Sequence, residues 1–395
     1  MYIYADNAAT TKMSDAALDV LIPCLREQYG NPSSLHSPGQ RAAEILQEAR
    51  QQTARAINAD PGEIFFTSGG SEADNMALFS LAHVGKARGK TKIVSTAFEH
   101  HAVLHTLDRL KEEGFEIVLL PVHENGIVRP EEAETVLDDK TALLSVMTVN
   151  NEIGTVQPIK ELGAVCRENG VFFHTDAVQA VGHIPVDVRE MNVDMLSASG
   201  HKFGGPKGVG FLYVRKGVPI RPLINGGQQE RGKRAGTENV PALAAMAAAL
   251  EDSVSRLPET MPHVTALRER LISGLSAIPH SRLNGDRAAR VPGTVNFCFE
   301  GIEGESLLLL LDEAGIAASS GSACTSGSLD PSHVLLSLGL CHEVAHGSLR
   351  LSVNESNTIE EMDYIVNKTA EVVSYLRSIS PMWDSIERGD IPHLI

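Results

Sequence analysis

A regular alternation of short apolar runs and helix-like stretches, from about residue 40 to residue 250, constrains the fold most. Several of the apolar runs are continuous, which is typical of strands covered by helices on both faces. Helix-like stretches such as Ser71–Lys86 and Ile159–Asn169 lie between them. We therefore predict an α/β fold with a mainly parallel, mixed sheet flanked by helices. The expected strands are Glu63–Thr67, Lys92–Thr96, Glu116–Pro121, Ala142–Val149, Val171–His174, Val193–Ser197 and Val209–Val214.

The pattern changes after this region and predicts a smaller α+β domain. We expect a large domain at residues 13–257 and a small domain at residues 1–12 and 258–395. A Gly/Ser-rich segment at 319–331 is predicted to be a mobile loop of the small domain. The expected elements are helices Pro241–Leu257, Val264–Ile278 and Gly301–Gly315, and strands Gly293–Phe299 and Ser348–Val353.

Composition excludes several classes of protein. The chain has 395 residues, 43% of them hydrophobic, and a net charge of -16, which argues against nucleic acid or an anionic membrane surface as a partner. No apolar run reaches the ~18 residues that a membrane helix needs, so we expect a soluble cytoplasmic protein. The five cysteines are few, odd in number and widely spaced, which predicts reduced thiols.

Lys202 lies between two predicted strands, beside Ser199, His201 and a glycine-rich turn. A lysine that forms a Schiff base needs its amine at a fixed point, partly shielded from water so that its pKa falls. The alternative is an ordinary solvated loop lysine.

Residues 67–73 form a glycine-rich turn between a predicted strand and a predicted helix. Gly70 and Ser71 stand at the start of the helix, where backbone N–H groups and the helix dipole suit a phosphate. Alternatively, Ser71 is an ordinary N-cap with Asp74 at the third helical position.

Further polar residues follow the ends of predicted strands. Asp176 could pair with a protonated pyridine nitrogen, and Gln179 or Asn151 could hydrogen-bond the oxygen of such a ring. Asp176 could instead cap a helix, and Asn151 is equally a turn residue. His100 could stack on an aromatic cofactor and move protons, or be a surface histidine. Arg350, on one face of a predicted strand, suits a substrate carboxylate or a salt bridge.

Cys324 is the only cysteine in the Gly/Ser-rich segment, and an accessible loop thiol can act as a nucleophile if a nearby group helps it to ionise. Cys24, Cys166 and Cys298 lie in helix or strand patterns and are predicted to be core residues. The role of Cys341 stays ambiguous.

Two motif matches are rejected. His342–His346 matches the H-E-x-x-H pattern of zinc proteases, but Gly347 and a strand follow at once and no third ligand is evident. Gly85–Thr91 is one residue short of a P-loop, and a strand follows it rather than a helix.

A series of segments, taken in order along nearly the whole chain, resembles the cysteine desulfurases of the NifS/IscS family, which are class-V aminotransferases of pyridoxal phosphate (PLP) fold type I. The segment before Cys324 has the long form of this branch, not the shorter form of the branch that resembles selenocysteine lyases. Ala345–Gly347 and Ser380–Trp383 look more like NifS, the nitrogen-fixation member. The matching segments are Tyr4–Thr11, Gly30–Ser34, Glu99–His100, Asn150–Glu152, His174–Gln179, Ser199–Lys202, Arg234–Asn239 and Ser319–Ser326.

The resemblance implies a homodimer in which Lys202 holds PLP and Cys324 carries a persulfide. His100 would stack on the cofactor ring, Asp176 would pair with its nitrogen and Gln179 with its phenolic oxygen. Ser71 stands where the family usually has Thr, which keeps the hydroxyl. The other implied residues are Asn151 near ring and substrate, Gly70, Ser71, Ser199 and His201 at the phosphate, Thr237 of the partner subunit at the same phosphate, and Arg350 at the substrate carboxylate.

The implied reaction converts L-cysteine to L-alanine and leaves sulfur on Cys324, from which the family passes it to iron–sulfur scaffold proteins. We expect no resident metal, and at most a transient iron–sulfur contact at Cys324. The alternatives are a selenocysteine lyase or another aminotransferase on the same fold, or a non-enzymatic scaffold that holds sulfur or metal.

Overall fold

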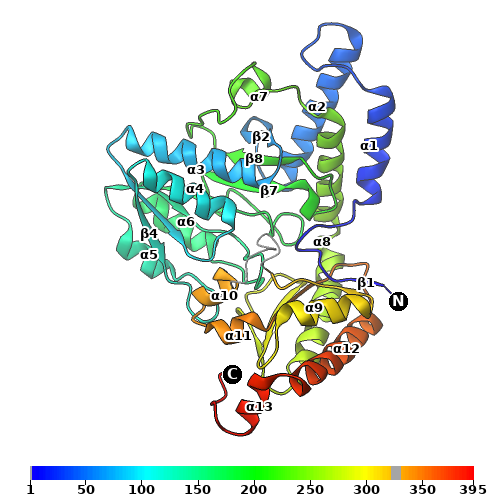
Figure 1. The fold of residues 1–395 in the computed structure, drawn as a ribbon. Coiled ribbons are helices and arrows are strands. Elements are labelled where there is room, and N and C mark those ends of the chain that lie inside the picture. The colour runs from blue at the N-terminus through cyan, green and yellow to red at the C-terminus, as the bar shows by residue number, and fades with distance from the viewer. Residues whose placement is uncertain (1, 322–330) are drawn as a thin grey trace.

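The computed structural model describes residues 2–321 and 331–395. Its larger sheet has seven strands in the order β2-β8-β7-β6-β5-β3-β4 (Figure 1). The strands from β4 to β7 pair in parallel, and β8 is antiparallel to both β7 and β2. The predicted mainly parallel sheet is confirmed. Its strands are β2 Ile64–Thr67, β3 Lys92–Thr96, β4 Glu116–Leu120, β5 Thr141–Ser145, β6 Phe172–Asp176, β7 Met195–Ser199 and β8 Gly210–Val214.

Helices cover both faces of this sheet, which explains why its central strands are apolar throughout. Successive side chains of a strand point to opposite faces. Leu143 of β5 belongs to a core cluster with residues of α3 and α4, whereas its neighbour Leu144 belongs to a cluster with residues of α2, α6 and α8. The helices are α1 Asp15–Glu27, α2 Ser37–Ala56, α3 Gly70–Lys86, α4 His101–Glu112, α5 Pro130–Val136, α6 Ile159–Glu168, α7 Gln229–Gly232 and α8 Val240–Leu275.

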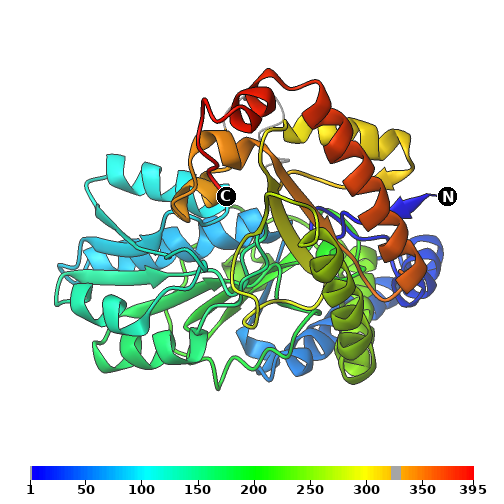
Figure 2. The same cartoon turned by 90° about the horizontal axis from the view of Figure 1, so that it is seen from below.

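A three-stranded antiparallel sheet, in the order β12-β10-β9, forms the second part. Helices α9 and α12 pack on it, and the N-terminal segment lies beside them (Figure 2). That segment pairs in parallel through β1 with β11, and Asp6 forms a bridge to Ser352 of β12. The remaining elements are β1 Ile3–Tyr4, β9 Ser281–Leu283, β10 Thr294–Phe299, β11 Ile316–Ala317, β12 Ser348–Ser352, α9 Gly304–Glu313, α10 His333–Ser337, α11 His342–His346, α12 Ile359–Ser378 and α13 Pro381–Glu387.

Helix α8 differs from the prediction of two separate helices. It runs unbroken from Val240 to Leu275 and contains Pro258 and Pro262. Its first half packs on α1 and α2, and residues of its second half join the core under α12. Packing on both sides of the prolines outweighs the cost of the backbone hydrogen bonds that they remove. The predicted domain boundary at 257/258 falls inside this helix, and the division into two domains remains a proposal.

The remaining predicted elements differ from the structure mainly at their ends. The predicted helix Gly301–Gly315 is α9, and α11 is as short as its sequence predicts, with β12 following directly after Gly347. None of the helices in the described ranges is both long and apolar enough to cross a membrane.

A buried ion pair joins α2 to α7. Both Nη atoms of Arg50 donate to the carboxylate of Glu230, at 2.8 and 2.7 Å. The same carboxylate accepts the backbone N–H of Phe66 in β2. Glu230 and Arg231 have positive φ values of 44° and 57°, and residues other than glycine rarely adopt such backbone angles. The ion pair therefore holds a strained turn against the edge of the large sheet.

We predict that Arg50→Met lowers the free energy of unfolding by about 3–5 kcal/mol, because it leaves the Glu230 carboxylate buried without its partner. Arg41→Met is the matched control, since Arg41 lies on the same helix and its ion pair with Glu44 is exposed. That change should cost less than about 1 kcal/mol. Urea unfolding of both variants measures the difference, and equal losses would show that the buried pair has no special role.

Candidate active site

A cavity of about 330 Å³ lies where the strands β5, β6 and β7 end. This is the edge of a parallel sheet at which ligands usually bind, and the volume is in the range of small-molecule sites. Thr237 is exposed and is not among the lining residues, and Cys324 lies outside the described residues. The predicted residues that line the cavity are Gly70, Ser71, His100, Asn151, Asp176, Gln179, Ser199, His201, Lys202 and Arg350.

Lys202 is the last residue of a short 3-10 helix, Gly200–Lys202, that directly follows β7. Its Nζ donates to the backbone carbonyls of Ala8 and Ala9, at 2.6 and 3.0 Å. The side chain is therefore held at the cavity wall, which disagrees with the alternative of a solvated loop lysine. The N-terminal segment supplies the wall that fixes this amine.

The start of α3 forms one end of the cavity. The N-cap is Gly69, with φ 151° and no side-chain cap, so the alternative that Ser71 caps the helix is wrong. A Cβ on Gly70 would come within 2.6 Å of Val178 Cγ2, so glycine keeps this approach open. Beside it, His201 Nδ1 lies 3.1 Å from Thr10 Oγ1. Burial and the nearby Lys202 charge lower the pKa of His201 to about 4.

Asp176 ends β6 and points to the cavity. Its Oδ1 accepts the backbone N–H of Val178 at 2.9 Å. No helix begins after it, so the N-cap alternative is wrong. Burial raises the pKa of Asp176 to about 6, although the Val178 hydrogen bond and the Lys202 charge act in the opposite direction. At neutral pH this carboxylate is therefore ionised next to Lys202.

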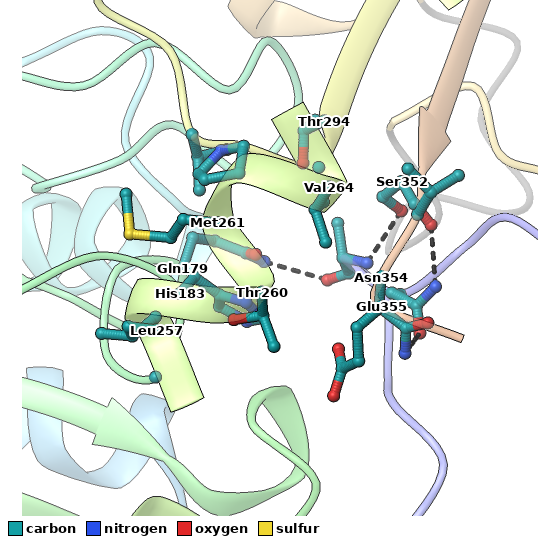
Figure 3. A pocket seen from close by; sticks show the side chains of 17 residues that line it. Gln179, His183, Leu257, Thr260, Met261, Val264, Thr294, Ser352, Asn354 and Glu355 are labelled. Atoms are coloured by element: carbon teal, nitrogen blue, oxygen red, sulfur yellow. Dashed lines mark hydrogen bonds between the residues drawn. The ribbon is translucent and has the colours of Figure 1, made fainter. Parts of the chain in front are cut away.

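Gln179 lines both the main cavity and a smaller crevice of about 60 Å³, which Figure 3 shows. Its Nε2 donates to the carbonyl of Ala8 at 2.9 Å, the same oxygen that accepts Lys202 Nζ. On the far side of the crevice, the Asn7 amide donates to the carbonyl of Ser352. These contacts tie the N-terminal segment to both sheets.

His100 is the N-cap of α4, and its Nδ1 accepts the backbone N–H of Ala102 at 3.1 Å. A neutral imidazole that accepts at Nδ1 carries its proton on Nε2. Burial, followed by the Lys202 charge, lowers the pKa of His100 to about 4. The ring at the cavity wall is thus neutral at physiological pH.

Arg350, in β12, is only 3% exposed. Its Nη2 lies 2.9 Å from Asp6 Oδ1, and its Nη1 donates to the carbonyl of Asn151 at 2.9 Å. The salt-bridge alternative is therefore present in the structure. Arg350 Nε and Asn151 Oδ1 are buried and have no hydrogen-bond partner among residues 2–321 and 331–395, although leaving such atoms unpaired is costly. Both residues line the cavity, which suits a polar ligand there.

Comparison with known proteins identifies the family. The profile of class-V aminotransferases matches residues 3–365. A cysteine desulfurase IscS of Clostridium botulinum is 50% identical over 97% of both chains. The chain belongs to the cysteine desulfurases of the class-V aminotransferase family. The cysteine desulfurase NifS of Azotobacter vinelandii is 44% identical, covering 96% of this chain and 95% of that one.

A solved structure titled NifS-like protein agrees with this membership. It has a TM-score of 0.89 and 40% identity, covering 95% of this chain and all of that one. Both comparisons support a PLP-dependent enzyme, so the predicted family, fold type and cofactor are confirmed.

Glu152 is a site residue of this cysteine desulfurase whose role the sequence did not reveal. Its Oε2 accepts the hydroxyl hydrogen of Ser332, and a Cβ on Gly321 would come within 2.8 Å of the same oxygen. Glu152 therefore contacts the chain on both sides of residues 322–330. Its position directly after Asn150-Asn151, at the end of a strand region, was the available signal.

Asp74 is a second residue that the sequence suggested only as a helix cap. It is 1% exposed, lines the cavity, and has no hydrogen-bond partner at Oδ1 among the residues that the structure describes. That atom lies 3.6 Å from Nε2 of His174, a buried ring whose pKa burial lowers to about 3. Burial and the Asp176 charge raise the pKa of Asp74 well above its usual range. The Asp74 carboxyl therefore stays protonated while the neighbouring Asp176 carboxylate is charged.

The cysteines outside the Gly/Ser-rich segment differ in exposure. Cys24, Cys166 and Cys298 are buried, as predicted for core residues, and Cys341 is exposed. Burial raises the pKa of the Cys298 thiol to about 12 and that of Cys166 even further, so neither is a nucleophile near neutral pH.

Glu99, the residue directly before His100, is a buried carboxyl next to the site. Its Oε1 accepts hydrogen bonds from the Thr96 hydroxyl and the backbone N–H of Met147, and its Oε2 has no hydrogen-bond partner in the described ranges. The side chain is fully buried, and burial raises its pKa to about 8. Because its pKa is ordinarily 4.5, the folded state holds an extra proton between pH 4.5 and 8, and stability falls as pH rises through this range.

We predict that Glu99→Gln becomes progressively more stable relative to the unchanged protein as pH rises from 4.5 to 8. The amide imitates the protonated acid and does not titrate, so the gain should reach up to about 1.4 kcal/mol per pH unit. Urea unfolding across this range measures the slope. The exposed Glu48→Gln is the control and should show none. A flat difference for Glu99→Gln would mean that Glu99 is already ionised.

Proposed function

We propose that this protein converts L-cysteine to L-alanine and keeps the sulfur as a persulfide on Cys324. The observation that carries the proposal is that one cavity combines Lys202, Asp176 and Arg350, while Glu152 contacts the chain on both sides of residues 322–330. Bound PLP supplies an electron sink for the carbanion that forms at the substrate Cα.

The cavity residues fit this cofactor in size and charge. Lys202 presents an amine that is held by two carbonyls, as a Schiff-base lysine requires. The start of α3 with Gly70 and Ser71, together with Ser199 and His201, suits the phosphate group. Ionised Asp176 suits a protonated ring nitrogen, and the amide of Gln179 suits the phenolic oxygen.

His100 would contact the cofactor ring, and Arg350 and Asn151 would bind the substrate. A neutral His100 can stack on the ring without adding a second positive charge beside Lys202. Within the part of the chain that the structure describes, Arg350 has a buried Nε without a hydrogen-bond partner, and Asn151 has a buried Oδ1 without one. Together they would bind the carboxylate and the amine side of the amino-acid substrate, because a guanidinium favours a carboxylate and an amide oxygen favours an N–H donor.

Cys324 is the proposed acceptor of the sulfur atom. It is the third residue after Gly321, which lines the cavity, and an extended chain covers at most about 11 Å over these three steps. The Cys324 thiolate attacks the substrate sulfur, and the bond between that sulfur and Cβ breaks. The electron pair of this bond remains on the substrate carbon skeleton, and Cβ then takes up a proton. Cysteine and one thiol thus become alanine and one persulfide.

The partner subunit would complete the phosphate site through its Thr237. Arg234 pairs with Glu72 at the start of α3, which holds the segment around Thr237 at the surface. Ser33 and Glu238 line one pocket, so residues 29–35 lie near this segment. Tyr29 and Leu35 are 82% and 91% exposed there, as expected of side chains that a second copy covers. The sulfur would then pass in the cytoplasm to an iron–sulfur scaffold protein.

We predict that Cys324→Ala binds PLP normally but loses turnover by more than the ~10²–10⁴-fold that removal of an acid–base group costs, because an obligatory nucleophile is gone. Alanine formation from L-cysteine measures this. Cys341→Ala is the matched control and should keep its turnover, and Lys202→Ala should lose the borohydride-reducible link to PLP. Peptide mass spectrometry with isotope-labelled cysteine should place the extra sulfur on Cys324, and sulfur mainly on Cys341 would contradict the assignment.

A shared phosphate site predicts complementation between subunits. Lys202→Ala and Thr237→Ala chains, mixed and allowed to exchange, should give heterodimers with one site that carries both defects and one intact site. Alanine formation should then rise well above that of either parent. If verified mixed dimers recover no activity, each site is complete within one chain.

A further inference from the structure

Glu300 lies directly after β10 in the small sheet, far from the catalytic cavity. It is a carboxylate with only 1% of its surface exposed. Two histidines meet it, His280 from the turn after α8 and His393 from the segment after α13. Among the described residues, these three form the one group of His, Cys, Asp or Glu side chains whose ligand atoms all lie within 4.8 Å of one another.

The nitrogen atoms converge on one oxygen of this carboxylate. Glu300 Oε2 lies 2.9 Å from Nδ1 of His393 and 3.5 Å from Nδ1 of His280. The other oxygen, Oε1, accepts the backbone N–H of Leu394, which fixes the orientation of the group. The two imidazole rings stack with their centroids 3.9 Å apart, and Trp383 packs against both with its edge.

The charge of Glu300 has little other compensation. Its ion pairs in the described parts of the chain are with the two histidines alone. The guanidinium of Arg377 is near enough to interact with the Glu300 charge. It makes no ion pair with that carboxylate, because it donates its hydrogen bonds to the backbone carbonyls of Glu300, Pro279 and His280 and stacks on Trp383. A buried carboxylate needs a counter-charge, and two imidazoles provide one only by protonation or by holding a cation.

We propose that His280, Glu300 and His393 bind a divalent transition-metal ion of the zinc class. Two ligand atoms at the usual distance from one tetrahedral zinc ion are separated by about 3.3 Å. The distances from Glu300 Oε2 to Nδ1 of His393 and of His280, 2.9 and 3.5 Å, lie on either side of this value. Two imidazoles and one carboxylate select zinc-class ions over magnesium or calcium. The Leu394 N–H holds the carboxylate as an outer-shell contact.

Metal binding requires one local change. A metal lies in the plane of the imidazole that binds it, so the stacked rings must tilt apart. The His393 side chain is 44% exposed and can turn without disturbing the core. An ion can reach the group from the solvent-exposed side of His393, and His280 also lines an open cavity of about 830 Å³. The ion would fasten residues 388–395 to the small sheet and leave the desulfurase cavity untouched, since none of its ligands lines that cavity.

Zinc titration of the chelator-treated holoenzyme tests this proposal, after its accessible thiols have been alkylated so that cysteines do not compete. The unchanged protein should bind one zinc ion more tightly than His393→Ala, by more than about tenfold. Magnesium should not compete, because two imidazole ligands favour ions of the zinc class. Zinc should also raise the melting temperature of the unchanged protein but not that of His393→Ala.

His342→Ala is the matched control, because His342 is exposed and belongs to the rejected H-E-x-x-H motif. It should bind zinc like the unchanged protein. Equal affinity in the unchanged protein and His393→Ala, loss of binding in His342→Ala instead, or no zinc binding at all would each overturn the proposal, and the three side chains would then be a hydrogen-bonded cluster only.

Discussion

The parallel pairing of β5, β6 and β7 is the constraint on which the active site depends. Ser145 pairs with His174, and Asp176 pairs with Ser197, so these strands end at the same edge of the sheet. Because side chains alternate along a strand, a slip of one residue would turn Asp176 away from the cavity. The continuous apolar sequence of the strands secures this register by burying both faces under helices. Polar residues that stand at or directly after the ends of these strands then reach the cavity.

The electrostatics of the cavity follow from how deeply this edge is buried. Burial keeps His100 and His201 neutral, and it favours protonation of Glu99 and Asp74. The charges that remain at the cavity are those of Lys202, Asp176 and Arg350. A site for a cofactor with a cationic ring nitrogen and an anionic phosphate, and for a zwitterionic substrate, needs its charges at such separate points. Neutral neighbours allow each charge to act on its own part of the ligand.

Much of this arrangement could be predicted from the sequence, because strand ends and glycine turns have local signatures. The strand β3 has the predicted ends, whereas β7 begins two residues late. Its expected first residues include Asp194, whose carboxylate instead accepts the backbone N–H of Phe173 and pairs with Arg215. The single helix α8 was missed because packing overrides its prolines. Glu152 was missed because Ser332, its partner, lies 180 residues away in the sequence.

The strand β12 connects the proposed substrate site with the chain that leads to Cys324. The backbone of Arg350 pairs with Ser319, and its side chain lines the cavity and pairs with Asp6. The same residue thus touches the proposed carboxylate site, the N-terminal wall behind Lys202 and the chain that leads toward Cys324. A shift of β12 would change all three together. The small sheet therefore does more than cover the cavity, because the pairing of Arg350 with Ser319 holds the chain shortly before Cys324, the proposed nucleophile.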